Sequence, residues 1–116
     1  MDIDAVAFSR MWEQAWNSHD VDAVLAHFHD DVVFTSPVAA QLLPETAGRV
    51  EGKAALRRYW TTALRSYPDL HFVVEQVYAG VDTLVLAYRN QLGVLVSEVL
   101  TFRGDRVSTG HGTYPL

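Results

Sequence analysis

Glu98 is the residue whose position most directly indicates chemistry. It lies in the apolar stretch Val94–Phe102, which is typical of a β-strand, and alternation along the strand places it on the same face as Leu100. A carboxylate on the inner face of a sheet is costly to bury unless it is paired, hydrogen-bonded or protonated. Because burial raises the pKa of a carboxyl group, Glu98 is predicted to be a general acid or base in an apolar cavity.

Arg89 and His111 are the predicted partners of Glu98. If Leu92-Gly93 is a two-residue hairpin loop, Arg89 lies diagonally across the hairpin from Glu98 and can pair with it. If Gly104-Asp105 is also a two-residue turn, His111 comes opposite Glu98 on the next strand. A Glu–His pair is suited to proton transfer near neutral pH, so both residues are predicted to be catalytic.

Each of these assignments has a structural alternative. Glu98 and Arg89 can form an ion pair with no catalytic role, and a shift of one residue in register would turn Glu98 to the outer face. A bulged turn before the last strand would turn His111 outward and bring Gly110, Gly112 and Tyr114 inside instead.

Aromatic side chains provide the expected walls of the cavity. Most of them belong to the hydrophobic core, and the remainder would line a pocket for a small planar ligand. The predicted ligand-binding residues are Trp12, Trp16, Phe34, Ser36, Tyr59, Trp60, Arg89, Leu100 and Tyr114. The sequence has no cluster of residues with metal-ligand spacing, so we expect neither a metal nor another cofactor.

Helical patterns occupy the first part of the chain. The spacing of apolar residues predicts one helix over 3–18, a second helix that follows the N-cap Asp20 and ends at Asp30-Asp31, and a third over 53–66. A short strand is predicted at Val32–Thr35. Residues 38–50 lack a clear period and are predicted to form a long loop with a helical turn near 39–43.

Patterns typical of β-strands occupy the last part of the chain, from residue 70 onward. Residues 70–79, 83–91, 94–102 and 106–114 alternate or run apolar, and turn residues separate them. Helices followed by a meander predict a single α+β domain over residues 1–116, in which three N-terminal helices pack on one face of a curved antiparallel sheet.

Four segments in this order are similar to the NTF2-like superfamily, close to the SnoaL-like polyketide cyclases and the ketosteroid-isomerase-like proteins. They read AWNSHDVD over 15–22, FTSP over 34–37, VEGKAAL over 50–56 and LTFRGDRV over 100–107. The resemblance implies a cone-shaped cystatin-like fold, an apolar pocket between helix and sheet, and a homodimer formed through the outer face of the sheet. It does not imply one reaction, because the superfamily includes isomerases, cyclases, other enzymes and binding modules that lack activity.

The resemblance also argues against steroid isomerisation. Ketosteroid isomerases carry a catalytic Asp directly before the Pro that ends the first strand, a Tyr on the first helix and a protonated Asp on a later strand. The matching residues here are Ser36, Trp12 and Leu100, which lack that chemistry. The expected function is therefore binding of a small hydrophobic, cyclic or polyketide-like ligand, with acid–base chemistry by Glu98. The alternative is a ligand-binding or dimeric assembly module that has no catalytic activity.

Composition narrows the range of partners. The 116 residues are 49% hydrophobic and carry a formal net charge of -5, with one lysine and no cysteine. Scattered basic residues on an acidic chain do not favour nucleic-acid binding, and the lack of cysteine excludes disulfide and thiolate chemistry. No apolar run is long enough to span a membrane and the first residues are acidic, so we expect a cytoplasmic protein with no membrane partner.

Overall fold

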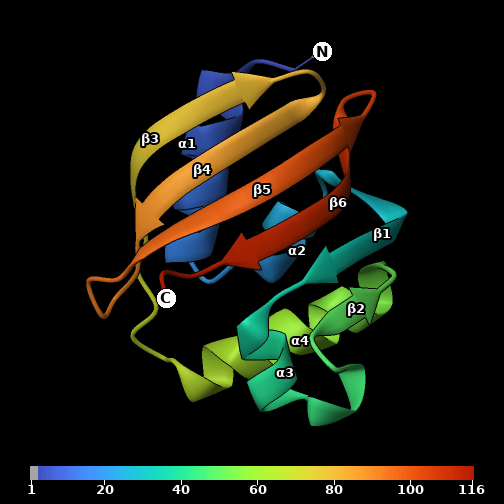
Figure 1. The fold of residues 1–116 in the computed structure, drawn as a ribbon, viewed down its shortest axis with the longest axis vertical. Helices are drawn as coiled ribbons and strands as arrows, with labels where there is room; N and C mark the ends of the chain where they lie inside the picture. Colours follow the sequence, from blue (N-terminus) through green and yellow to red (C-terminus); the bar gives the residue numbers. More distant parts are fainter. Residues whose placement is uncertain (1–2) are drawn as a thin grey trace.

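The helices come first along the chain and the long strands last (Figure 1). The computed structural model describes residues 3–116. Its elements are α1 (Ala5–Asn17), α2 (Val21–Leu25), β1 (Phe28–Thr35), α3 (Pro37–Leu42), a 3-10 turn (Pro44–Thr46), β2 (Arg49–Glu51), α4 (Lys53–Ser66), β3 (Val73–Gly80), β4 (Thr83–Arg89), β5 (Leu95–Arg103) and β6 (Arg106–Thr113).

One six-stranded sheet organises the molecule. Its strand order is β2-β1-β6-β5-β4-β3, in which β3 to β6 form an antiparallel meander and β1 runs parallel to β6. The predicted α+β class and meander are confirmed. The parallel β1–β6 pair was not predicted, because it joins strands that lie far apart in the sequence.

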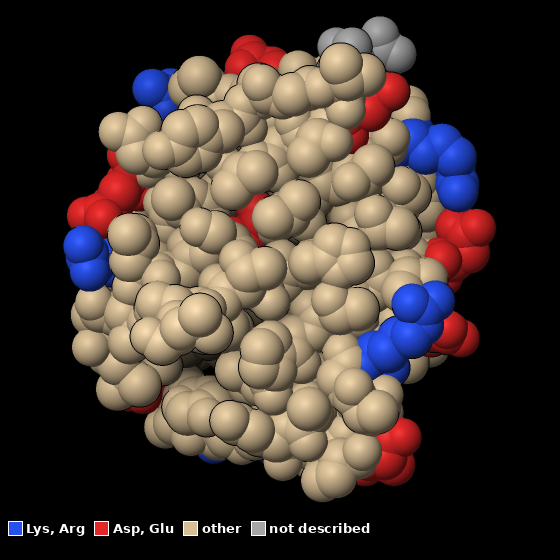
Figure 2. Space-filling model, in the orientation of Figure 1, with Lys and Arg blue, Asp and Glu red and all other residues tan. Residues whose placement is uncertain are grey.

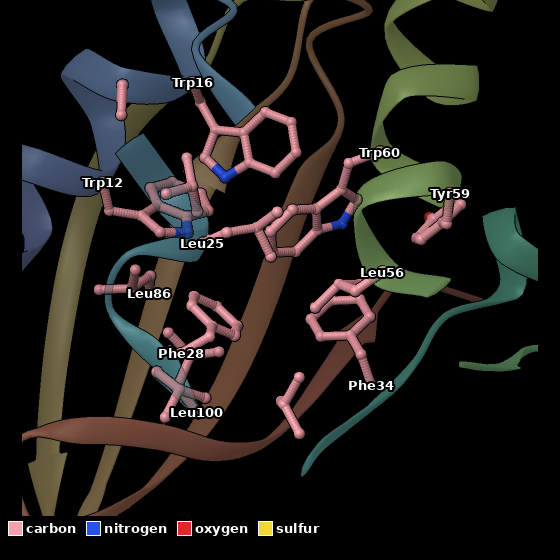
Figure 3. Close-up of a cluster of buried hydrophobic side chains, with 14 of the residues drawn as sticks. Trp12, Trp16, Leu25, Phe28, Phe34, Leu56, Tyr59, Trp60, Leu86 and Leu100 are labelled. Atoms are coloured by element: carbon pink, nitrogen blue, oxygen red, sulfur yellow. The ribbon is translucent and has the colours of Figure 1, made fainter. Parts of the chain in front are cut away.

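The helices cover one face of the sheet and leave the other open. In Figure 1, α1 and α2 lie behind the strands, while α4 extends along the lower part of the molecule. Between helices and sheet lies a core whose largest fully buried side chains include Trp12, Phe28, Leu56, Leu86 and Leu100, several of which are drawn in Figure 3. Each such side chain contributes about 2 kcal/mol or more to folding by its removal from water.

Side-chain caps fix where three helices begin. Asp4 accepts a hydrogen bond from the Ala7 amide, and Asp20 accepts one from the Ala23 amide, as predicted for that N-cap. Ser36 caps α3 in the same way. The predicted loop over 38–50 therefore contains α3, the 3-10 turn and β2, and β1 begins at Phe28, earlier than predicted.

The loop between β4 and β5 is longer than the predicted two-residue turn. The Asn90 amide donates to the Val94 carbonyl, and the Asn90 side chain accepts hydrogen bonds from the amides of Leu92 and Val94. Gly93 adopts a positive φ of 74°, which glycine tolerates without strain. This arrangement shifts the register by one residue, so that Glu98 pairs with Leu86 and Arg89 with Leu95.

The β5–β6 hairpin combines a tight turn with a bulge. Arg103 pairs with Arg106 across Gly104-Asp105, as the predicted two-residue turn requires, and Phe102 pairs with Val107. The register then shifts at Ser108, so that Thr101 pairs with Thr109. The bulge reverses the faces of the later residues in β6.

None of the helices within residues 3–116 combines the length and the apolar character that crossing a membrane requires.

Candidate functional site

A cavity of about 360 Å³ opens between the helices and one end of the sheet. Its walls come from α1, α4, the end of β1, β4 and β5, and its mouth is bordered by α3, the β4–β5 loop and the C-terminal segment. The lining residues are Trp16, Phe34, Ser36, Pro37, Val38, Gln41, Tyr59, Trp60, Ala63, Tyr67, Leu70, Phe72, Tyr88, Asn90, Gln91, Leu92, Val94, Glu98 and Tyr114. A concave, largely aromatic space of this size is typical of a small-molecule site.

Helical spacing and edge-to-face packing hold the aromatic wall in place. Tyr59 and Trp60 are adjacent on α4 and both are buried. The Trp60 ring packs nearly perpendicular to Phe34 of β1 and to Trp16 of α1, at centroid distances of 5.7 and 4.9 Å. Figure 3 shows Trp16, Trp60 and Phe34 projecting from these elements toward one another. Such contacts fix ring positions and keep the wall rigid.

Glu98 is the only carboxylate among the lining residues. Its place on β5 directs it to the helix-covered face, where it is 5% exposed. Burial raises its pKa to about 7, and a hydrogen bond from Tyr88 on the neighbouring strand partly opposes that rise. No ion pair within residues 3–116 involves Glu98. It therefore exchanges its proton near neutral pH, as a general acid or base must.

Hydroxyl groups surround this carboxylate. The Tyr59 hydroxyl donates to Ser36 Oγ over 3.3 Å, and Ser36 Oγ also accepts from the Val38 amide. Burial, reinforced by the charge of Glu98, raises the pKa values of Tyr59 and Tyr88, and it raises that of Tyr114 to about 12. The tyrosines therefore stay protonated at neutral pH and serve as hydrogen-bond donors.

Two glycines of β6 leave room beside these groups. A Cβ atom added at Gly112 would lie 3.4 Å from Ser36 Oγ and 3.5 Å from Glu98 Oε1, so both oxygens border the space above Gly112. A Cβ atom at Gly110 would instead lie 2.7 Å from the Phe34 ring. Gly110 therefore admits an aromatic wall residue, and Gly112 keeps the space next to the carboxylate open.

Most of the predicted ligand-binding residues lie around this cavity. Those that line it are Trp16, Phe34, Ser36, Tyr59, Trp60, Tyr114 and the predicted catalytic Glu98. Trp12 and Leu100 do not line it. Both are fully buried in the core, where Trp12 stacks on Phe72 at 5.5 Å and Leu100 packs against the Gly110 position.

The predicted contact between Arg89 and Glu98 is wrong. Because the β4–β5 loop shifts the register by one residue, Arg89 lies on the outer side of the sheet, away from Glu98. There its guanidinium group pairs with Glu75 over 3.2 Å and donates to the Gly93 carbonyl. The cavity consequently has no arginine in its wall.

The predicted Glu98–His111 pair is also wrong. The bulge at Ser108 places His111 opposite Val99 on the outer face, and Gly112 takes the position opposite Glu98. His111 Nδ1 lies 2.6 Å from Thr35 Oγ1, outside the cavity. The alternative with Gly110, Gly112 and Tyr114 inside corresponds to the structure.

Sequence reasoning noted the Tyr88 hydroxyl as a possible donor but did not include Tyr88 among the predicted site residues. Tyr88 shares a face with Leu86 and Leu84, and the correct register places it beside Glu98. Two further lining residues, Gln41 and Gln91, lie in a predicted helical turn and at the end of a predicted strand, and neither was predicted to belong to the site. A three-residue loop over 91–93, which Asn90 and Gly93 favour, would have given the correct register. Alternation counted from that loop turns Tyr88 to the same face as Glu98. No group of metal-ligating side chains occurs within residues 3–116.

Comparisons with known proteins fit this geometry. A family model described as the SnoaL-like domain matches residues 8–113. A SnoaL-like protein of unknown function from Burkholderia thailandensis is 42% identical over 97% of this chain and 94% of its own, with a TM-score of 0.89. No curated protein matches the sequence.

More distant structures share the fold alone. A candidate polyketide cyclase from Sinorhizobium meliloti is 16% identical over 96% of this chain and all of its own, with a TM-score of 0.73. TerC, co-crystallised with polyporic acid, is 12% identical over 96% of this chain and 91% of its own, with a TM-score of 0.79.

Proposed function

Because this chain belongs to the SnoaL-like family of the NTF2-like superfamily, we propose that its cavity binds a small hydrophobic, cyclic or polyketide-like ligand and that Glu98 transfers protons to and from it. The observation that carries the proposal is the buried carboxylate in an aromatic cavity with no cationic partner. A carboxyl group with a pKa of about 7 is well matched to proton transfer at neutral pH.

The hydroxyl groups around Glu98 can stabilise the negative charge that proton removal creates on the ligand. Removal of a proton next to a ligand carbonyl by Glu98 would develop negative charge on the carbonyl oxygen. The hydroxyls of Tyr88, Tyr59 and Tyr114 remain protonated, and each has one hydrogen to donate. Tyr59 would turn its hydrogen from Ser36, and Tyr88 from Glu98, to reach that oxygen. A relative of the same fold has been co-crystallised with a small molecule, polyporic acid, which supports a ligand of this size class.

Proton exchange on an enolisable bicyclic ketone tests the acid–base role. With β-tetralone in D₂O, we expect the protein to accelerate exchange of the protons next to the carbonyl, measured by NMR. Glu98→Gln should abolish the acceleration, while Glu75→Gln, which removes an exposed carboxylate of β3 that pairs with Arg89, should retain it. Equal exchange in the Glu98→Gln and unmodified proteins would remove Glu98 from the mechanism.

A binding role without turnover is the second candidate. It is favoured because the structure does not form the predicted Glu98–His111 pair. The only other titratable residues in the cavity wall are tyrosines. Trp16 and Trp60 line the cavity, so their fluorescence should report a bound ligand in either case. Binding of β-tetralone without any accelerated exchange would select this second function.

We also propose a homodimer formed through the outer face of the sheet. Figure 2 shows this face with most charged side chains at its rim and a broad centre in which few charged atoms are visible. Val85 and Val99 pair there across β4 and β5, and Tyr78 of β3 is 58% exposed beside them. A sheet face of this kind suits a second copy of the same chain, since an isologous contact repeats one patch on both partners.

A further inference from the structure

The charge balance of the cavity points to a class of ligand. Glu98 lies at its wall almost fully buried, and no lysine, arginine or histidine belongs to the lining. Arg89, the cationic residue of the adjacent strand, pairs with Glu75 on the other side of the sheet. Burial removes water from the carboxylate and disfavours its charged form, and no protein cation offsets this cost. A cationic ligand would stabilise the charged form.

The aromatic rings that line the cavity together with Glu98 are of the types that attract a positive charge. Tyr88, Tyr59 and Tyr114 lie close enough to Glu98 for its charge to act on each of their hydroxyl groups, and Trp16 and Trp60 continue the wall. The faces of tyrosine and tryptophan rings attract cations, and aromatic cages recognise ammonium groups in this way. A carboxylate combined with several aromatic rings therefore favours an ammonium group.

We propose that the cavity selects hydrophobic amines, with the protonated nitrogen of the ligand paired to Glu98 and its apolar part against the aromatic wall. This inference rests on the second candidate function, binding without turnover in the same cavity, because a carboxylate paired with an ammonium group is not free to take a proton from carbon. A carboxylate or phosphate ligand would place a second negative charge near Glu98 with no cation to offset it.

The titratable groups that face the nitrogen come from each surrounding element. They are Glu98 of β5, Tyr88 of β4, Tyr59 of α4, Tyr67 at the end of α4 and Tyr114 of the C-terminal segment, whereas α1 and α3 contribute only uncharged side chains. Glu98 changes charge near neutral pH, whereas the raised pKa values of Tyr88, Tyr59 and Tyr114 keep those three hydroxyls neutral there. Selectivity for amines should therefore appear above pH 7 and disappear as Glu98 is protonated.

Three ligands with one ring system and different charges test the inference. Naphthylmethylamine, naphthylmethanol and naphthoate would be titrated at about pH 8 and about pH 5 with tryptophan fluorescence as the readout. At about pH 8 we expect the amine to bind about tenfold more tightly than the alcohol, and naphthoate to bind most weakly. At about pH 5 the advantage of the amine should be lost.

The variant Glu98→Gln should remove the same advantage at about pH 8 while binding of the alcohol persists. Glu75→Gln, the exposed control, should leave the order unchanged. If Glu98→Gln does not fold, the pH series on the unmodified protein still decides the question. Binding of the alcohol as tightly as the amine at about pH 8 would overturn the inference and leave the proposed function intact. Failure of all three ligands to bind would contradict both.

Discussion

At the scale of single residues, the buried carboxyl group of Glu98 distinguishes this cavity from an ordinary gap in a core. Its pKa rises from an ordinary 4.5 to about 7 because the folded chain removes it from water. A group whose pKa is raised on folding stabilises the folded state fully below its unfolded pKa, and that contribution is lost as the pH rises through the folded value. Stability should therefore fall between about pH 4.5 and pH 7.

Replacement of Glu98 by glutamine should remove this pH dependence. Each pKa unit corresponds to about 1.4 kcal/mol, so the variant should be more stable than the unmodified protein by up to about 3 kcal/mol at about pH 8. Near pH 4 the two proteins should have similar stability. Urea unfolding at both pH values measures the difference, with Glu75→Gln as the exposed control. If the free energy of unfolding changes with pH by the same amount in the unmodified protein and in Glu98→Gln, Glu98 is not buried as described.

Gly110 and Gly112 form a matched pair of substitutions on β6. Gly110→Ala would place a methyl group 2.7 Å from the Phe34 ring, and the overlap should reduce the free energy of unfolding by about 1–3 kcal/mol. Gly112→Ala makes ordinary contacts at 3.4 Å or more, so we expect a change below about 1 kcal/mol. Thermal unfolding of both variants checks the contrast. Equal losses would show that Phe34 does not pack on Gly110.

Sequence reasoning placed Glu98 correctly but not its predicted partners Arg89 and His111. Alternation places Glu98 on the same face as Leu100, and the resemblance to the NTF2-like superfamily implied that the Leu100 position faces the pocket. The positions of Arg89 and His111 depended on the loop between two strands and on a bulge, and each of these shifts a register by one residue. Registers are fixed by packing across strands as well as by turn residues, so a single sequence leaves them open.

At the scale of elements, α3 links secondary structure to the site. Ser36 follows the last residue of β1, caps α3 through the Val38 amide and accepts a hydrogen bond from Tyr59 in the cavity. Its place before Pro37 is readable in the sequence as an N-cap, although the segment was predicted to be mostly loop. Helix α4 was predicted with the bounds that the structure shows, because its apolar spacing continues over 14 residues.

Ser36→Ala should therefore affect both stability and binding. Loss of the cap should lower the free energy of unfolding by about 1 kcal/mol, and loss of the Tyr59 partner should weaken binding of naphthylmethanol. Asp4→Ala is the matched control, because it removes a similar cap on α1 far from the cavity. It should cost a similar amount of stability and leave binding unchanged. An equal loss of binding in both variants would show that Ser36 acts only through overall stability.

At the scale of the whole molecule, the two faces of the sheet have separate roles. The inner face carries the core and the cavity, and the outer face carries the patch of Figure 2 in which few charged atoms are visible. The sequence predicted this division through the order of helices and strands. It did not indicate that β1 would run parallel to β6 and extend the sheet, since that contact joins residues about 75 positions apart.

The proposed dimer is tested by a charge placed at the centre of the outer face. Val99→Glu should convert the protein to a monomer, because two copies of the new carboxylate would meet across an interface with few charges. Val81→Glu, in the exposed turn between β3 and β4, is the control and should leave the dimer intact. Sedimentation velocity distinguishes the two states. A monomeric unmodified protein would exclude this interface.

The protonation of Glu98 itself is the most direct test of the account. With ¹³C-labelled glutamate, the side-chain carboxyl resonance that disappears in Glu98→Gln identifies this residue, and its chemical shift can be followed through a pH titration. We predict a midpoint near pH 7, because the carboxyl group lies in an aromatic cavity without a cationic partner. A midpoint near the ordinary 4.5 would contradict that environment, and with it the role of Glu98 in proton transfer.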